Sequence, residues 1–395
     1  MTKKFSSQQW TVLIGACLFQ CAMIGLLVNC SGVLFAQIRV ELGMSMTKIS
    51  AFNTIKGVTG MIAAATITDL FFKMNKAWFL LINQLLMIGS FVVLILGADS
   101  WIWYFASVIN GLSMCISTVA VPYILTQWFP RNAGFATGVA MAFSGIGGAI
   151  FSPLCAELIA RFGWEVTILI YGAITLMLTI PGLLLMFRKR PETAREQASK
   201  PASDSASGKK QTGTFLLLSV ALLAGGMGVQ FAINVSMYAQ SIGYMLSVGA
   251  YMTTMIMVGN LVSKFLYGWL CDMLGVWRAT ALMLVLAAGA TLCFILVQSQ
   301  LFILLAASLV FGCVYALSMV GISRCCAVAY DAGNYQKYLG LHVAVNSGTT
   351  AAFALLSGMI YDVAQSFIPV LLIILGTFAL SLLSVMRLSK ARQAA

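Results

Sequence analysis

The sequence has very little charge for its length. Only 9% of its 395 residues are Asp, Glu, Lys or Arg, whereas soluble globular domains carry roughly 25%. A water-soluble surface cannot be built from so few charges, so most of the chain has to face lipid or other helices. Hydrophobic residues make up 61% of the chain, and one membrane-spanning helix needs about 20 of them. The composition therefore predicts a polytopic helical membrane protein.

The sequence also lacks the common signatures of catalysis and of nucleotide binding. It contains no G-x-x-x-x-G-K-[ST], H-E-x-x-H or G-x-S-x-G motif, and it has one histidine. Its glycine-rich stretches, such as 134–138 and 225–228, place small residues at helical spacing, which lets membrane helices pack closely. The ten cysteines are scattered through apolar runs, without the spacing of a zinc site. We therefore expect no enzyme, no cofactor, no bound metal and no ATP-driven pump.

Twelve apolar runs follow one another and predict twelve membrane-spanning helices. They lie at about 10–36, 46–70, 77–97, 101–128, 134–159, 166–187, 215–240, 247–270, 279–298, 301–329, 338–361 and 367–386. One long hydrophilic stretch, 188–213, is rich in Pro, Ser, Ala and Lys, as flexible tethers are. The predicted fold is all-α, with an N-terminal six-helix bundle at 1–187, a cytoplasmic linker at 188–213 and a C-terminal six-helix bundle at 214–395.

Basic residues outnumber acidic ones by 23 to 11. They concentrate in the termini and in alternate loops, at 3–4, 73–76, 131, 188–213, 278, 337 and 387–392. Cytoplasmic loops of membrane proteins carry such an excess of Lys and Arg, so it requires no nucleic-acid partner. We expect a functional monomer in the lipid bilayer of a cell membrane, of the bacterial cytoplasmic type. Both termini are expected in the cytoplasm, with 1–9 as a basic tail rather than a cleaved signal.

The two halves of the sequence repeat one another. Asp69, near the end of the second run, and Asp272, near the end of the eighth, are 203 residues apart. Two glycine pairs repeat at offsets of 201 and 202 residues, Gly111 with Gly312 and Gly138 with Gly340. Parallel six-helix repeats are a known architecture of secondary transporters.

One segment carries a specific resemblance. Between the eighth and ninth runs, Gly268, Asp272 and Gly275 form the pattern G-x-L-x-D-x-x-G. Together with the twelve runs and the central linker, this pattern resembles the major facilitator superfamily across essentially the whole chain. The resemblance implies a gating role for these residues and for Asp69. The first-half copy has alanine and phenylalanine at positions 65 and 72, where the family usually has glycine.

Two other stretches, 29–45 and 128–138, resemble the monocarboxylate transporters and the bacterial oxalate–formate exchangers within that superfamily. In the monocarboxylate transporters, span 8 carries an Asp and, four residues later, an Arg; the matching residues here are Asn260 and Lys264. The exchangers place a lysine in span 11, where Asn346 stands here. The resemblance implies anion transport but not the identity of the anion.

Three basic residues lie inside predicted spans: Lys56, Lys264 and Arg324. A charge at membrane depth is costly and usually faces a protein interior or an aqueous cavity. No acidic residue lies equally deep in the sequence, so the three cations would repel one another unless an anion bound between them. The alternative for Lys264 and Arg324 is that their long side chains reach toward Asp272 and Asp331 at the cytoplasmic end.

Aromatic residues and the single histidine are further candidates. Tyr123 corresponds to Arg324 through the repeat, and Tyr315 lies in the same span as Arg324; each is a candidate cavity residue, with packing as the alternative. His342 lies in the first turns of span 11. A neutral, hydrogen-bonded packing histidine is the favoured interpretation, and a proton relay is the alternative.

These features predict a secondary transporter of small organic anions, carboxylates above all, that works by alternating access. A proton symporter needs a titratable group in its path, and Asn260 cannot titrate, so exchange or facilitated diffusion is favoured over proton symport. The alternatives are a proton-coupled monocarboxylate symporter and a membrane sensor that binds a ligand without transporting it.

Overall fold

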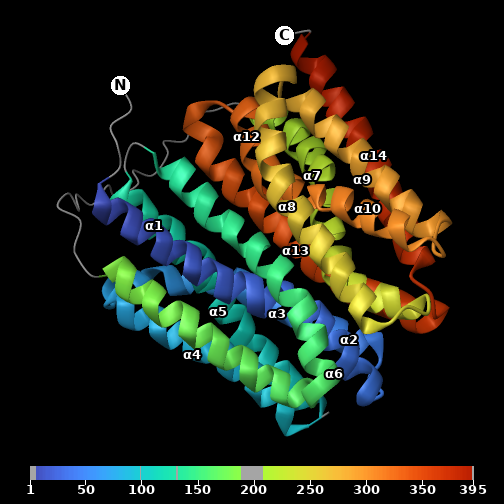
Figure 1. Ribbon diagram of the computed structural model, residues 1–395. Coiled ribbons are helices and arrows are strands. Elements are labelled where there is room, and N and C mark those ends of the chain that lie inside the picture. The colour runs from blue at the N-terminus through green and yellow to red at the C-terminus, as the bar shows by residue number, and fades with distance from the viewer. Residues whose placement is uncertain (1–5, 98, 130–131, 188–207, 394–395) are drawn as a thin grey trace. The chain divides into compact units, whose positions relative to one another are not determined.

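The computed structural model describes residues 6–97, 99–129, 132–187 and 208–393. Every regular element among these residues is a helix, which confirms the all-α prediction. The chain divides into two compact units, 1–197 and 198–395, and each is described by itself. In Figure 1 the helices of each unit pack lengthwise against one another.

The first unit has a helix at each of the six positions where the sequence predicts a span. Its elements are α1 (Ser7–Gln20), η1 (Cys21–Asn29), α2 (Ser31–Glu41), α3 (Met46–Lys73), α4 (Lys76–Val92), η2 (Val93–Leu96), α5 (Ser100–Trp128) and α6 (Ala133–Phe187). The first span comprises α1, η1 and α2. The fifth and sixth form one long element, α6, which is interrupted at Gly163, where φ is 79° and ψ is 168°. This break falls between the two expected spans.

The second unit contains the other six. Its elements are α7 (Gly208–Ser241), α8 (Leu246–Leu274), α9 (Val276–Leu296), α10 (Leu301–Phe311), α11 (Cys313–Ala316), η3 (Leu317–Gly321), α12 (Ile322–Ala329), α13 (Ala332–Ala364) and α14 (Ile368–Gln393). The tenth span comprises α10, α11, η3 and α12. Most of the expected linker, 188–207, lies outside the described residues. Its last six residues, 208–213, are helical and begin α7, and the stretch of α7 that is long and apolar enough to cross a membrane begins at Gly213.

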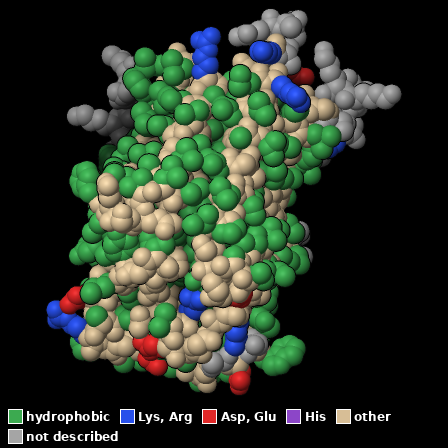
Figure 2. Space-filling view, turned by 90° about the vertical axis from the view of Figure 1, so that its right-hand side faces the viewer, with side chains coloured by type: hydrophobic (Ala, Val, Ile, Leu, Met, Phe, Trp, Pro, Cys, Tyr) green, Lys and Arg blue, Asp and Glu red, His purple; other side chains and the backbone are tan. Residues whose placement is uncertain are grey.

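Nine helical stretches in the described part of the chain are long and apolar enough to cross a membrane. One of them, Gly134–Phe187, contains the fifth and sixth spans. On the face in Figure 2, hydrophobic side chains cover the middle, and Lys, Arg, Asp and Glu side chains gather toward the two ends. A belt of apolar side chains between charged ends is the surface that a bilayer requires.

Two spans contain a π-helical segment that the sequence analysis did not predict. In the first span this is η1, and in the tenth it is η3. A π-helix is rare and occurs often at functional sites. The first span packs closely against α6 at η1. A Cβ placed on Gly25 would lie only 2.8 Å from the Cα of Gly147 in α6. The two backbones therefore meet without side chains between them.

Candidate functional site

The first unit positions Lys56 at the crossing of α3 and α5. A Cβ on Gly111 of α5 would collide with the carbonyl oxygen of Lys56, and a Cβ on Gly60 would lie 3.2 Å from the carbonyl oxygen of Gly111. Glycine is needed on α5 because the backbones are this close. The crossing fixes the depth of Lys56 in the bundle.

The Lys56 side chain is 8% exposed. Its Nζ donates a hydrogen bond of 2.8 Å to Oδ1 of Asn53, one turn earlier on α3. An amide oxygen satisfies one of the three ammonium donors but does not neutralise the charge. No acidic side chain forms an ion pair with Lys56 among the described residues. A buried cation without a counter-anion is costly, and an anion placed beside it would offset that cost.

The second unit has the same crossing between α8 and the tenth span. A Cβ on Gly312 would collide with the carbonyl oxygen of Ile256 and would lie 2.5 Å from the backbone nitrogen of Asn260. Since Gly111 approaches the carbonyl oxygen of Lys56 in the same way, the residue of the second unit that corresponds to Lys56 is Ile256.

Lys264 lies two turns further along α8 and is half-buried. In the part of the chain that the structure describes, it has neither a hydrogen bond nor an ion pair. Asn260, four residues earlier, is buried, and its Oδ1 has no hydrogen-bond partner among the described residues. Residues four apart share one face of a helix, so Asn260 and Lys264 present an unused acceptor and an unused cation side by side.

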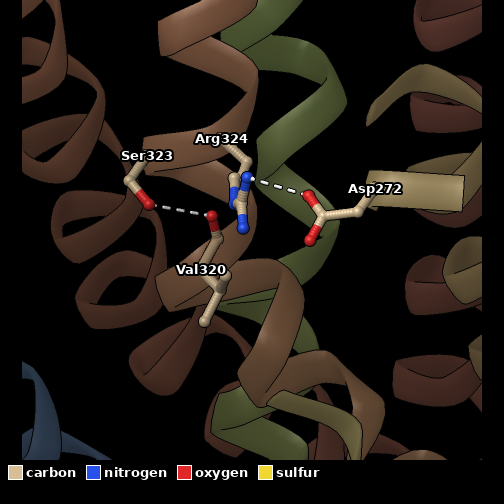
Figure 3. Close-up of polar contacts among 4 residues, drawn as sticks. All are labelled: Asp272, Val320, Ser323 and Arg324. Carbon is tan, nitrogen blue, oxygen red and sulfur yellow. Dashed lines mark hydrogen bonds and ion pairs between the residues drawn. The ribbon is translucent and has the colours of Figure 1, made fainter. Parts of the chain in front are cut away.

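Arg324 differs from the two lysines. Its Nη1 lies 3.4 Å from Oδ1 of Asp272, and Figure 3 shows the guanidinium pointing at that carboxylate. The two side chains are 44% and 68% exposed. The expectation that Arg324 lacks a counter-anion was wrong, because packing brings α12 beside the end of α8, although the residues are 52 apart in sequence.

The two tyrosine candidates have different surroundings. Tyr123 is half-buried, and the Nζ of Lys76 lies 5.8 Å from the centre of its ring. Its hydroxyl also accepts a hydrogen bond from Nε2 of Gln127. Tyr315 is buried, and its hydroxyl has no hydrogen-bond partner among the described residues. Tyr123 thus contacts Lys76, the first residue of α4, and Gln127. The Tyr315 hydroxyl, next to η3, has no hydrogen-bond partner in the described structure.

Asn346 joins α13 to η3. Its Nδ2 donates to Oγ of Ser318 at 2.9 Å, and its Oδ1 is buried without a partner in the described structure. A Cβ on Gly226 of α7 would lie 3.0 Å from that Oδ1. Three elements therefore meet at the Asn346 amide.

His342 is 1% exposed and has partners at both ring nitrogens. Its Nδ1 lies 3.3 Å from Oγ of Ser219, and its Nε2 lies 3.0 Å from the hydroxyl of Tyr330. The ring of Phe215 packs over it at 4.8 Å between centroids. These contacts fit a packing histidine that ties α7, α12 and α13 together.

The residues with the gating pattern surround the α8–α9 turn. Gly275 separates the two helices with a φ of 80°, a conformation that favours glycine. Gly268 is half-buried, and a Cβ there would meet no atom within 4 Å. Asp272 pairs with Arg324. The side chain of Asp69 lies outside the described residues.

The family model that matches this sequence is that of the Major Facilitator Superfamily, and it covers residues 13–347. The chain belongs to the major facilitator superfamily. It is therefore a multi-pass membrane transporter and not an enzyme. Among solved structures, a mutant form of the nucleoside transporter NupG matches 97% of this chain and 100% of its own, with a TM-score of 0.78 and 13% identity. That likeness shows the superfamily fold.

Relatives within the superfamily match at low identity. Monocarboxylate transporter 12 of Rattus norvegicus is 28% identical over 228 residues, which are 49% of this chain and 45% of that protein. MFS-type transporter pynF of Aspergillus niger is 24% identical over 292 residues, covering 71% and 64%. The uncharacterized MFS-type transporter YhjX of Escherichia coli is 27% identical over 176 residues, covering 43% of each. The chain matches less than half the length of monocarboxylate transporter 12.

Sequence reasoning missed several polar residues inside this transporter. Gln20, at the end of α1, is fully buried, and neither its Oε1 nor its Nε2 has a partner in the described structure. Asn53 binds Lys56, and Tyr330 binds His342. The spacing of Asn53 and Lys56, three residues apart in a helix, could have identified that pair. Nothing in the sequence indicates the others, because their neighbours are distant in the chain.

Proposed function

We propose that this transporter carries small organic anions, carboxylates above all, by exchange or facilitated diffusion rather than obligatory proton symport. The observation that supports it most is Lys56, a cation buried in the first unit whose hydrogen-bond partner is an amide. Lys264 adds a second unpaired cation in the other unit. A carboxylate would supply the negative counter-charge that each lysine lacks, through charge-assisted hydrogen bonds.

The choice between exchange and proton symport rests on which groups in the transport path could carry a proton. Asn260 stands where the monocarboxylate transporters have an acid, and an amide does not exchange protons. His342 has hydrogen-bond partners at both nitrogens, so it is engaged in packing. Neither group offers a proton carrier, which favours exchange. We further propose that the protein acts as a monomer in a cell membrane, with both termini in the cytoplasm, in accord with the basic loops.

The test is transport by the purified protein in proteoliposomes. Vesicles preloaded with an unlabelled carboxylate should take up labelled carboxylate faster than empty vesicles. Lys56→Gln should abolish this uptake, whereas Lys390→Gln, which removes an exposed lysine near the end of α14, should transport as the wild type does. Wild-type rates in Lys56→Gln would refute the role of Lys56, provided that both variants insert and unfold alike.

The same vesicles separate the alternatives. An inward proton gradient without internal anion should not drive accumulation, and accumulation under these conditions would establish a proton symporter. A protein that binds carboxylates but never exchanges them would be a sensor. A thermal-shift screen with mono-, di- and aromatic carboxylates would narrow the substrate, since a ligand stabilises the state that it binds.

A further inference from the structure

A groove on the outside of the first unit lies apart from all these residues. It has a volume of about 570 Å³ and is formed where α4 begins and α6 ends. Trp78 and Leu81 line it from α4, and Ile180, Leu184 and Phe187 line it from α6. Sites for small molecules have volumes of about 300–1,000 Å³. Every lining residue is apolar, so the groove suits a hydrocarbon chain.

A described basic residue, Lys76, adjoins this apolar groove. Lys76 is the first residue of α4, next to Ala77 and Trp78 in the groove wall. The N-terminus of this 17-residue helix adds a partial positive charge. In the sequence, 73–76 and 188–190 contain five basic residues and no acidic one. An occupant of matching chemistry has an apolar tail and an anionic head.

We propose that this groove binds an anionic phospholipid, with an acyl chain along Trp78 and Leu184 and the phosphate beside Lys76. Trp78 is 62% exposed and Leu184 is 68% exposed, so a lipid can reach both side chains from the bilayer. A tryptophan beside a basic residue is typical of the level at which phospholipid head groups lie. The site is independent of the transported substrate.

The test compares two lipids that share acyl chains and differ in the head group. Native mass spectrometry of the full-length protein in detergent would give dissociation constants for palmitoyl-oleoyl phosphatidylglycerol and phosphatidylcholine. One basic residue near anionic lipid contributes about 1 kcal/mol, or about fivefold in affinity. The wild type should therefore bind phosphatidylglycerol at least about fivefold more tightly.

Three variants locate the site. Lys76→Gln should weaken phosphatidylglycerol binding about fivefold without changing phosphatidylcholine binding, and Lys76→Arg should retain it. Leu184→Trp should fill the groove and weaken both lipids at least about tenfold; because Leu184 is exposed, folding should not suffer. Trp101→Ala is the matched control, because Trp101 is 84% exposed and lies at the start of α5.

Several results would overturn the proposal. Equal affinity of the wild type for the two lipids would show that the positive charge at Lys76 does not select an anionic head group. Unchanged binding in Leu184→Trp would place the lipid elsewhere. A dimer that Leu184→Trp dissociates would show that a second copy of the chain occupies the groove. None of these measurements depends on transport, so they leave the proposed function untouched.

Discussion

The two units share a helix crossing but place their cations differently on it. In the first unit Gly111 packs against the backbone of Lys56, and in the second Gly312 packs against the backbone of Ile256. The lysine of α8, Lys264, stands eight residues further along its helix, which is about 12 Å. The glycines give the two units the same close helix crossing, but the lysines stand at different positions along their helices. A repeat of backbone contacts therefore does not imply a repeat of binding groups.

A second crossing differs in its polarity. In the first unit Gly25 of η1 meets Gly147 of α6, backbone against backbone, whereas in the second unit Gly226 of α7 meets the polar side chains of Asn346 and Thr350. Close glycine contacts hold helices by packing alone, and polar contacts can be exchanged for contacts with a ligand or water. At this crossing the second unit thus has polar side chains where the first unit has backbone alone.

The largest effect in this comparison of the two units is expected when a glycine at a helix crossing is replaced, and it is an effect on stability. In Gly259→Ala the new Cβ would collide with the Leu309 carbonyl oxygen, so α8 and α10 would have to separate. Overpacking of this kind costs about 3 kcal/mol or more when backbone has to move. Gly60→Ala, at the corresponding crossing, would place its Cβ 3.2 Å from the Gly111 carbonyl oxygen and should cost less than about 1 kcal/mol. Unfolding of the two variants in the same detergent measures the loss of stability in each. Equal losses for Gly259→Ala and Gly60→Ala would contradict this prediction.

The next effect concerns the cation of the second unit. Lys264→Ala should reduce carboxylate exchange at least about tenfold, since a hydrogen bond to a charged group contributes about 1.5–3 kcal/mol. Lys264→Arg should retain part of the activity, with altered preference among carboxylates because its planar head binds them in a bidentate way. Initial rates in proteoliposomes measure this effect. Wild-type exchange in Lys264→Ala would mean that Lys264 only reaches toward solvent.

The histidine cluster is a feature of the second unit alone. At the 202-residue offset of the repeat, His342 corresponds to Ala140, which is buried in the first unit. His342→Ala would leave Ser219 and Tyr330 without this partner and would open a cavity, which should lower the free energy of unfolding by about 2 kcal/mol. Exchange per folded molecule should stay within about twofold. Loss of gradient-driven accumulation in this variant would instead identify His342 as a proton carrier.

The smallest effect is expected at the Arg324–Asp272 pair. The side chains are 44% and 68% exposed, and solvent-exposed pairs contribute about 0.2–1 kcal/mol. A double-mutant cycle with Arg324→Gln and Asp272→Asn should give a coupling energy in that range, falling as salt is added. In the first unit Tyr123 takes the position of Arg324 and lies beside Lys76. Tyr123→Phe keeps the ring but removes the hydrogen bond from Gln127, so it should cost only about 1 kcal/mol. A coupling above about 2 kcal/mol would show that the pair is shielded from solvent.

The sequence by itself determined the class of the molecule. Long apolar runs can be stable only in lipid, and each has to form a helix there, because no water is available for its backbone groups. The runs therefore predicted the all-α class and the positions of the helices, and the motif Gly268–Gly275 indicated the superfamily. The sequence also made Lys56 and Lys264 candidate binding residues, since a charge within an apolar run is conspicuous.

Only the tertiary structure decided how these residues are partnered. The Arg324–Asp272 pair, the partners of His342, the π-helical segments and the groove at Trp78 all depend on the rotation and register of neighbouring helices. A soluble helix reveals its rotation by alternating apolar and polar faces. These helices are apolar on nearly every face, because lipid accepts the same side chains as a protein core. Their contacts are therefore set by small residues such as Gly111 and Gly312, whose meeting points the linear sequence does not specify.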